Sequence, residues 1–535
     1  MIKKNRSLIH LKDKYMNKIK NNNDKLGLIL GIILLIIYIF LATKKEGFHV
    51  DEFFSYLNAN ISSEELNELK ESGTNTYTGK QLLEYCMVRD KSEAFDYKEV
   101  WKNQTEDTHP PLFYAIIHTV SSILLTHCDL IYIGVAINRV IALLTYIVLC
   151  KLMELFLENK KNAVFVAFLY SISMAFVNCM MFVRMYMLLV FFSIALTYLL
   201  CKSVSEDKYS FKFYLQLAFV VCGGMLTQYY FLIYLCFSCL ILATYLIYKK
   251  YFKVLICGMI DVGVSLGVAY LIYPEAVYQM VGGDRGEQAL QNMAESDFFS
   301  RLSGMFGIIN EQVFGGLAVL ILIFVVLLLI FLLIGSKIKN INISPEYMIL
   351  VLPAICSFCV IAKIAAYIVD RYIMALMFAF FFGVFLLIYK LLRNITTDKM
   401  SKFITLTIMI VCVIKSYEDS IPFAMVGADT YEQQIQQFSP DTKCIYLYDE
   451  GREWVVQCNL FQMENLNEIT FYNHTDFLYY CTDFSQYDEL IIYNSMEIDD
   501  ESVNEIVQTA CEKGNYNECK YLFSYGYSDT YVLTR

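Results

Sequence analysis

Two neighbouring carboxylates, Asp51 and Glu52, follow the first long apolar segment, in the sequence His49-Val50-Asp51-Glu52. A carboxylate is a common general base, and an apolar setting at the lipid headgroup level raises its pKa toward the range where it works well near neutral pH. The simpler alternative is an ordinary acidic start to a loop. We predict that both carboxylates take part in proton transfer at a membrane surface.

Cationic side chains form the second candidate group. His109 precedes a Pro-Pro pair, which favours an extended segment followed by the start of a helix. Arg139, Arg184 and Arg371 fall within or beside apolar segments, where a charge usually faces a cavity or a partner. Guanidinium groups bind phosphate in a bidentate manner, so these residues predict an anion site. A surface ion pair between Asp370 and Arg371 is an alternative for the last of them.

The histidines and cysteines indicate no metal centre. Their spacings match no standard set of metal ligands. We therefore predict no metal site and no cofactor, and the sequence leaves a divalent-metal requirement open.

The composition places these residues in a membrane protein. Of 535 residues, 57% are hydrophobic and only 18% are charged, whereas soluble domains carry about 25% charged residues. So little charge cannot cover the surface of several soluble domains. This excludes an ordinary soluble enzyme, a disordered chain and a nucleic-acid-binding protein. We predict an α-helical polytopic membrane protein.

A span needs about 20 apolar residues. Eleven candidates occur, at 26–43, 131–156, 163–181, 186–202, 213–228, 230–248, 254–273, 313–335, 347–366, 372–392 and 403–417. Lys and Arg concentrate in segment 1–25 and in alternate short loops, which places 1–25 in the cytoplasm and loop 44–111 outside it. The apolar segment 112–126 is short for a span and predicts an interfacial helix. The expected location is the cell membrane.

The last part of the chain, 418–535, is acidic and would lie outside the cytoplasm. A helix-like stretch, 501–513, separates the last two of four strand-like runs, which are 443–448, 468–472, 489–493 and 520–524. This alternation predicts a small α/β domain. Its five cysteines would allow one or two disulfides there.

The candidate residues gather on the outer side of the predicted membrane domain, 26–417. A base beside a phosphate-binding group suits displacement of a phosphate leaving group. Nucleotide sugars and ATP are generally absent outside the cytoplasm, and the chain has no Walker A, GxGxxG or GxSxG motif. A lipid-linked phosphate is the substrate that would be present.

The motifs and their order resemble the GT-C membrane glycosyltransferases, in particular the protein O-mannosyltransferase and aminoarabinose-transferase-like group, which is glycosyltransferase family 39-like. The resembling pieces are His49-Val50-Asp51-Glu52, Thr108-His109-Pro110-Pro111-Leu112-Phe113-Tyr114, Asn138-Arg139-Val140, Arg184-Met185-Tyr186, Thr227-Gln228-Tyr229-Tyr230 and Arg371-Tyr372. Together they cover roughly residues 26–392, and the acidic tail lies outside the resemblance.

The resemblance implies an inverting glycosyltransferase that moves a monosaccharide from a polyprenyl-phosphate donor to an acceptor hydroxyl at the extracytoplasmic face. Asp51 would be the base that activates the hydroxyl, and Glu52 would bind the acceptor or orient Asp51. The residues that would bind the donor phosphate or sugar are His109, Arg139, Arg184, Tyr186, Arg371 and Tyr372. Two positions depart from the group, because some relatives have Lys at the position of His109 and His at that of Gln228.

The partners implied are a polyprenyl-phosphate-linked sugar, membrane lipids and an acceptor that is a glycan, a lipid or a protein. No nucleic acid is expected. The main alternative is a lipid or glycan transporter or flippase, which predicts inverted repeats and helices broken at the midplane. A catalytically inactive surface-assembly protein or receptor is the third possibility.

Overall fold

The computed structural model describes residues 25–125 apart from 70, 72 and 74, and then 130–335, 343–449, 458–480 and 484–535. Residues 1–24 of the predicted cytoplasmic segment lie outside these ranges. So do the basic residues at 337 and 339, His127 and Cys481. The predictions made for them stay predictions.

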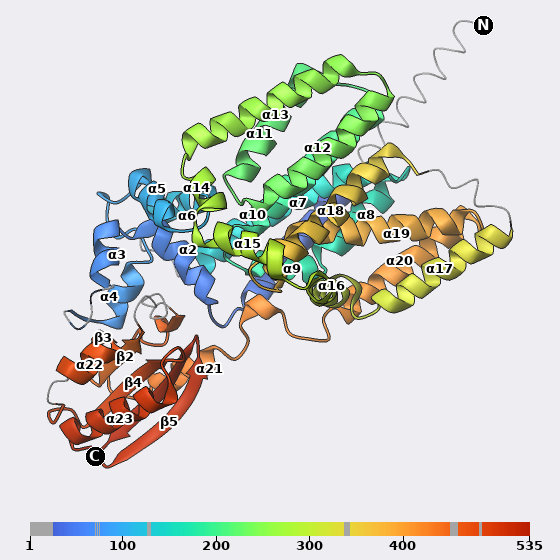
Figure 1. Cartoon of the computed structure of the whole chain (residues 1–535). Helices are drawn as coiled ribbons and strands as arrows, with labels where there is room; N and C mark the ends of the chain where they lie inside the picture. The colour runs from blue at the N-terminus through green and yellow to red at the C-terminus, as the bar shows by residue number, and fades with distance from the viewer. Residues whose placement is uncertain are drawn as a thin grey trace, which may run out of the picture.

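The body of the molecule is a bundle of apolar helices (Figure 1). Among the residues that the structure describes, seven helices are long and apolar enough to cross a membrane: Lys25–Ala42, α7 (Leu130–Glu154), α10 (Tyr186–Glu206), α12 (Tyr230–Tyr248), α13 (Phe252–Ile272), α18 (Pro345–Ile364) and α19 (Met377–Arg393). The central helix α10 packs against α7, α11 and α18 and is the most enclosed of the seven. The prediction of a polytopic helical membrane protein is confirmed.

Two further candidate spans are bent pairs of helices. α8 (Lys160–Ser171) meets α9 (Met174–Met181) at 55°, and α16 (Phe298–Phe314) meets α17 (Ala318–Ile334) at 83°. Gly315 and Gly316 make the sharper bend, because both adopt a positive φ that other residues rarely take. A Cβ at Gly315 would also approach the Lys415 Cβ within 2.5 Å.

Two helices outside that set occupy the remaining predicted spans. They are α11 (Phe211–Met225), with 15 residues, and α20 (Asp398–Lys415), with 18. Each of the eleven predicted spans thus corresponds to a helix or a bent pair. Seven helices, or nine spans if each bent pair crosses once, pass by length and apolar character. The number eleven stays a prediction.

Small helices lie at the end of the bundle that carries the tail, together with short 3-10 turns (Figure 1). They are α2 (Val50–Asn60), α3 (Ser63–Leu69), α4 (Gly79–Glu84), α5 (Tyr97–Glu106), α6 (Leu112–Leu124), α14 (Ala276–Val281), α15 (Asp284–Glu295), η2 (Asp370–Tyr372), η3 (Met374–Leu376), η4 (Pro422–Ala424) and α21 (Asp429–Ile435). The helix predicted at 112–126 is α6, whose 13 residues are too few for a span. Its place at the membrane interface stays a prediction.

In the described residues, five strands of the tail and one from the loop 44–111 form a six-stranded sheet with the order β1-β3-β2-β4-β6-β5. Its strands are β1 (Thr76–Tyr77), β2 (Lys443–Tyr448), β3 (Glu468–Asn473), β4 (Glu489–Ser495), β5 (Glu518–Tyr525) and β6 (Ser528–Thr534), with α22 (His474–Tyr480) and α23 (Asp500–Gly514) beside them. The central β2 is parallel to β3 and β4, and the other pairs are antiparallel. The small α/β domain is confirmed, and all four predicted strands occur.

Two strands were not predicted. β6 buries Ser528 and Thr530 beside Val532 and Leu533, so its sequence lacks a clean alternation of apolar and polar residues. β1 has only two residues and comes from the loop 44–111, where it pairs with β3. The loop and the tail therefore share one sheet. In the described part of the tail, the four cysteines Cys444, Cys458, Cys511 and Cys519 are free thiols.

Candidate active site

The first turn of α2 carries both predicted carboxylates. His49 caps the helix: its Nδ1 accepts a hydrogen bond from the Asp51 backbone N–H at 3.2 Å, and its own backbone N–H donates to Glu52 Oε2 at 2.8 Å. Successive residues of a helix point about 100° apart around its axis. Asp51 and Glu52 therefore face different surroundings although they are neighbours in sequence.

Asp51 forms an ion pair with Arg371 of η2. The two side chains are 21% and 17% exposed, so the pair opens toward solvent. The alternative Asp370–Arg371 pair is wrong, because Asp370 instead accepts hydrogen bonds from Asn178 at 2.7 Å and Gln312 at 3.0 Å. These two bonds hold Asp370 and thereby position the short turn that presents Arg371.

Glu52 lies in a closed environment. Its side chain is fully buried and pairs with the equally buried Lys45 at 2.9 Å. It also accepts a hydrogen bond from the Val183 backbone N–H at 2.7 Å, while Lys45 donates to the Phe423 carbonyl at 2.8 Å. Of the two roles expected for Glu52, this environment favours orientation of Asp51 over contact with an acceptor.

Arg184 lies in the short connection between α9 and α10 and is buried beside a second acidic group. Its guanidinium donates to the Tyr114 hydroxyl at 3.0 Å and to Ser55 Oγ at 3.4 Å, and it lies 3.4 Å from His109 Nδ1. The carboxylate of Asp107 contacts the same His109 nitrogen at 3.3 Å and the Tyr114 hydroxyl at 3.4 Å. The motif around His109 and the motif at Arg184 thus form one polar cluster.

The charges of this cluster determine how Asp51 titrates. Burial alone would raise the pKa of Asp51, but Arg184, Arg371 and the histidines outweigh it and hold the pKa below its ordinary value. The predicted rise is therefore wrong in direction, because the sequence did not reveal two guanidinium groups beside one carboxylate. Burial lowers the pKa of His49 and of His109, so both imidazoles are neutral at pH 7.

A cavity of about 270 Å³ adjoins the cluster. It lies between the start of α6, the start of α12, α14, α15 and the turn before η2. His109 and Tyr372, both predicted site residues, are part of its wall. The lining residues are Thr108, His109, Gln228, Tyr229, Tyr230, Leu232, Ile233, Gln279, Met280, Arg285, Gly286, Ala289, Ile364, Ala366 and Tyr372.

Arg285 is the one cation among the residues that line this cavity, and it was not predicted as a site residue. Its guanidinium lies 5.3 Å from the centre of the Tyr367 ring and donates to Gln288 at 2.8 Å. It lies between the predicted spans 254–273 and 313–335, but α15 has no motif that marks a site. Only the packing of α15 against α18 places Arg285 beside the residues of η2.

The predicted aromatic residues fall into two environments. Tyr186 is buried and stacks on Phe182 at 5.6 Å, which in turn stacks on Phe423 at 3.8 Å. Tyr372 packs edge-on against Tyr230 at 5.2 Å in the cavity wall. Only Tyr372 of the predicted pair reaches the cavity.

Arg139 lies apart from the cluster. It is on α7, where its Nε donates to the Val135 carbonyl of the same helix at 3.4 Å. Across residues 25–535 as far as they are described, no hydrogen bond or ion pair joins it to Asp51, Arg184 or Arg371. Its predicted contact with a donor therefore has no counterpart among the interactions of this structure.

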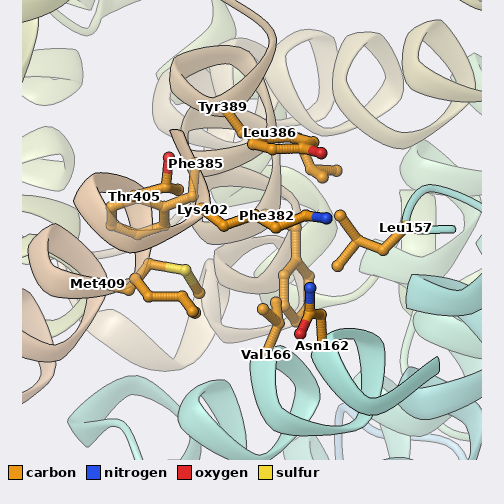
Figure 2. Close-up of a pocket in the computed structure, with 11 residues that line it drawn as sticks. Leu157, Asn162, Val166, Phe382, Phe385, Leu386, Tyr389, Lys402, Thr405 and Met409 are labelled. Carbon is orange, nitrogen blue, oxygen red and sulfur yellow. The ribbon is translucent and has the colours of Figure 1, made fainter. Parts of the chain in front are cut away.

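A second, smaller cavity of about 40 Å³ lies between α8, α19 and α20 (Figure 2). Its wall is largely apolar, with Val166, Phe382 and Phe385 facing inward and Lys402 reaching across it. Such a volume holds only a few atoms. None of its lining residues is a carboxylate, so it offers no base for chemistry.

A family model covers the middle of the chain. Residues 108–279 match the family described as dolichyl-phosphate-mannose-protein mannosyltransferase, over about a third of the sequence. The matched segment contains His109, Arg139, Arg184 and Tyr186. The resemblance to the protein O-mannosyltransferase group of GT-C enzymes is thereby confirmed, and the match supports a membrane glycosyltransferase.

Three similar solved structures illustrate the likeness of the fold. ArnT from Cupriavidus metallidurans in the apo state has 10% identity and a TM-score of 0.48, over 94% of this chain and 97% of that one. The Archaeoglobus fulgidus oligosaccharyltransferase in complex with Zn and sulfate has 11% identity and a TM-score of 0.45, over 92% and 73%. The archaeal oligosaccharyltransferase AglB from Archaeoglobus fulgidus, in complex with an inhibitory peptide and a dolichol-phosphate, has 10% identity and a TM-score of 0.40, over 94% and 74%. No curated protein matches the sequence.

Proposed function

We propose that this chain is an inverting glycosyltransferase that uses a polyprenyl-phosphate sugar as donor and an acceptor hydroxyl at the extracytoplasmic face of the cell membrane. The observation that carries the proposal is the Asp51–Arg371 pair, which is ionised, part-exposed and beside a cavity whose wall supplies a further cation, Arg285. The family match supports a lipid-linked donor.

Asp51 is the proposed general base. Its carboxylate takes the proton of the acceptor hydroxyl while that oxygen forms a new bond to the anomeric carbon of the donor. The bond from the anomeric carbon to the phosphate oxygen breaks, and its electron pair leaves with the polyprenyl phosphate. Attack from the side opposite the leaving group inverts the configuration. The phosphate is a good leaving group, so the reaction needs no strong general acid.

The charge balance of the cluster indicates where the donor phosphate binds. Asp51 and Asp107 carry two negative charges and Arg184 and Arg371 two positive ones, while both histidines are neutral. The cluster is therefore already neutral without a ligand. Arg285 adds the positive charge that a phosphodiester in the cavity requires, because an unpaired charge away from bulk water is costly.

The remaining predicted residues take supporting roles in this proposal. Arg371 pairs with Asp51 and precedes Tyr372 of the cavity wall, so its proposed role is to stabilise charge that develops on the phosphate as the bond breaks. Arg184, His109 and Tyr372 shape the donor side. Glu52 with Lys45 fixes the first turn of α2 and so orients Asp51.

A binding experiment tests this proposal without knowledge of the sugar. Polyprenyl phosphate is titrated into the protein in nanodiscs, and thermal stability is followed. A ligand at 100 times its Kd should add about 2.7 kcal/mol to the free energy of unfolding. Arg285→Ala should weaken binding about tenfold or more, since the loss of one charge-assisted contact is worth about 1.5–3 kcal/mol.

The matched control is Arg393→Ala. Arg393 is an exposed arginine that pairs with Asp398, at the opposite end of α19 from η2. Its loss should leave binding unchanged. A folded wild-type protein that shows no saturable shift would contradict the proposal and would favour the transporter or the non-catalytic alternative.

A further inference from the structure

The turn between β5 and β6, Tyr525 to Ser528, is fixed by one buried amide of the tail. Asn459 is fully buried; its Nδ2 donates to the Tyr525 carbonyl at 3.1 Å, and its Oδ1 accepts from the Ser528 hydroxyl at 3.1 Å and the Tyr446 hydroxyl at 2.8 Å. Gly526 in this turn has a φ of +62°, and a Cβ there would come within 3.0 Å of Cys458. The turn is therefore a rigid feature that packs closely on residues 458 and 459.

The same turn is attached to the segment that leads into α2. The Tyr525 hydroxyl donates to the Phe48 carbonyl at 3.2 Å, three residues before Asp51. Phe461 packs its ring against Phe48 at 5.3 Å and Phe53 at 6.3 Å. The tail thus contacts the residues on both sides of the proposed base, and its sheet includes β1 from the same loop.

Tyr527 presents an aromatic ring at the tip of the turn. Its backbone adopts a φ of +68°, and its carbonyl accepts a hydrogen bond from the Met496 backbone N–H at 2.9 Å. These constraints set the direction of the side chain, which is 48% exposed. An exposed ring on a strained and well-anchored turn suggests a binding role rather than core packing.

Asp51 and Arg371 also influence the pKa of the Tyr527 phenol. Burial raises the pKa of Tyr527. The nearby Cys458 and Asp51 raise the pKa of Tyr527 further, and Arg371 lowers it. Burial raises the pKa of the Cys458 thiol, again with a contribution from Asp51. The charge of Asp51 thus contributes to raising the pKa of both Tyr527 and Cys458.

We propose that the Tyr525–Ser528 turn forms the acceptor wall of the active site, with the Tyr527 ring stacked on a sugar ring of a glycan acceptor whose hydroxyl then reaches Asp51. The inference rests on the proposed function and adds the substrate class on the acceptor side. The apolar C–H face of a sugar fits an aromatic ring, and the Tyr527 side chain is part-exposed. The cavity proposed for the donor is lined by His109 and Tyr372 and by no residue of the tail, so donor and acceptor would approach Asp51 from different sides.

The form of the sheet edge favours a glycan over a peptide. An extended peptide would add to a free strand edge, and β5 is the edge strand nearest the turn. That edge is interrupted by an irregularity between Tyr521 and Phe523 and carries Lys520, two devices that block strand addition. α21 also packs against β5 and stacks Tyr431 on Phe523 and Tyr525.

The test measures mannotriose binding to the full-length protein in nanodiscs saturated with polyprenyl phosphate. Tyr527→Asn removes the ring and keeps a residue that tolerates a positive φ. It should raise the Kd for mannotriose about tenfold, as expected for the loss of one aromatic contact. Tyr527→Phe should restore binding. Tyr521→Asn is the control, because Tyr521 is a similarly exposed tyrosine on the same hairpin, within β5 rather than in the turn.

All variants should bind polyprenyl phosphate with the wild-type Kd. Absence of saturable mannotriose binding in the wild type, or equal binding in Tyr527→Asn, would overturn the acceptor assignment while leaving the donor assignment intact. Loss of polyprenyl-phosphate binding in Tyr527→Asn would place the residue on the donor side and would also overturn it. A wild-type protein that binds no polyprenyl phosphate would instead refute the proposed function itself.

Discussion

Two adjacent carboxylates of this protein have opposite environments. Asp51 pairs with Arg371 at a part-exposed position beside a cavity, whereas Glu52 pairs with Lys45 where neither side chain has any exposed surface. The helix geometry separates them, because one residue step turns the side chain by about 100°. An open ion pair can exchange its partner for a substrate, and a closed one can only hold structure. This difference supports the proposed role of Asp51 as the base and of Glu52 in holding the first turn of α2.

Replacement of the open carboxylate should have the largest effect. Asp51→Asn keeps the shape of the side chain and removes the base, so transfer should fall by about 10²–10⁴-fold. Polyprenyl-phosphate binding should stay near the wild-type value, because Arg285 is unchanged. Transfer is measured with labelled donor, and binding by the thermal titration. Normal transfer by a folded Asp51→Asn protein would refute the mechanism.

Disruption of the closed pair should act on stability instead. Lys45→Met leaves Glu52 buried without its cation, which should lower the free energy of unfolding by about 3–5 kcal/mol. Lys45→Met combined with Glu52→Gln removes both charges and should recover much of that loss. Thermal unfolding of the three proteins in nanodiscs measures this. Equal stability of all three would mean that the buried pair does not hold the first turn of α2.

A smaller expected effect concerns the pH dependence of transfer, which should respond to the Asp51–Arg371 pair and not to the Glu52–Lys45 pair. The base acts when deprotonated, so the rate falls as the pH falls through the pKa of Asp51. Burial raises that pKa and the guanidinium groups lower it. Arg371→Gln removes one of them, so the acid limb of the pH–rate profile should move to higher pH. Lys45→Arg, which keeps the closed pair charged, should leave the limb in place; an unmoved limb in Arg371→Gln would mean that the pair does not set the ionisation of the base.

The smallest effect is expected one contact further from the base. Gln312 donates to Asp370, which precedes Arg371. Gln312→Leu should cost about 1 kcal/mol of stability and should shift the acid limb in the same direction as Arg371→Gln, but less. A change in stability without any change in the pH profile would show that Gln312 supports the fold alone.

Much of the fold could be predicted because its signals are local. Apolar segments of span length predicted the helices, and the four strand-like runs of the tail correspond to β2, β3, β4 and β5. β6 was not predicted because its buried positions include the polar residues Ser528 and Thr530. β1 was not predicted because its two residues form a strand only by pairing with β3. The bends at residues 172–173 and 315–317 divide two predicted spans, and Gly315-Gly316 gave the one local sign of them.

The sequence predicted which types of residue the candidate site contains, but it predicted less well which of them contact one another. His109 and Arg184 meet as expected, and Asp51 meets Arg371 from 320 positions away. Arg139 has no hydrogen bond or ion pair to that group among the described residues. Arg285 was missed because nothing in α15 marks it, and Tyr527 because the tail lies outside the family resemblance.

The sequence by itself determined that this is a polytopic membrane protein with an acidic α/β tail and a cluster of carboxylate and guanidinium groups. Hydropathy and charge depend on residue type and order, so they can be read along the chain. Only the tertiary structure decided which carboxylate is open, that the pKa of Asp51 is lowered, that Arg285 lines a cavity with His109 and Tyr372, and that the tail contacts the segment leading into α2. Those properties depend on distances and burial between segments far apart in sequence, and no local pattern encodes them.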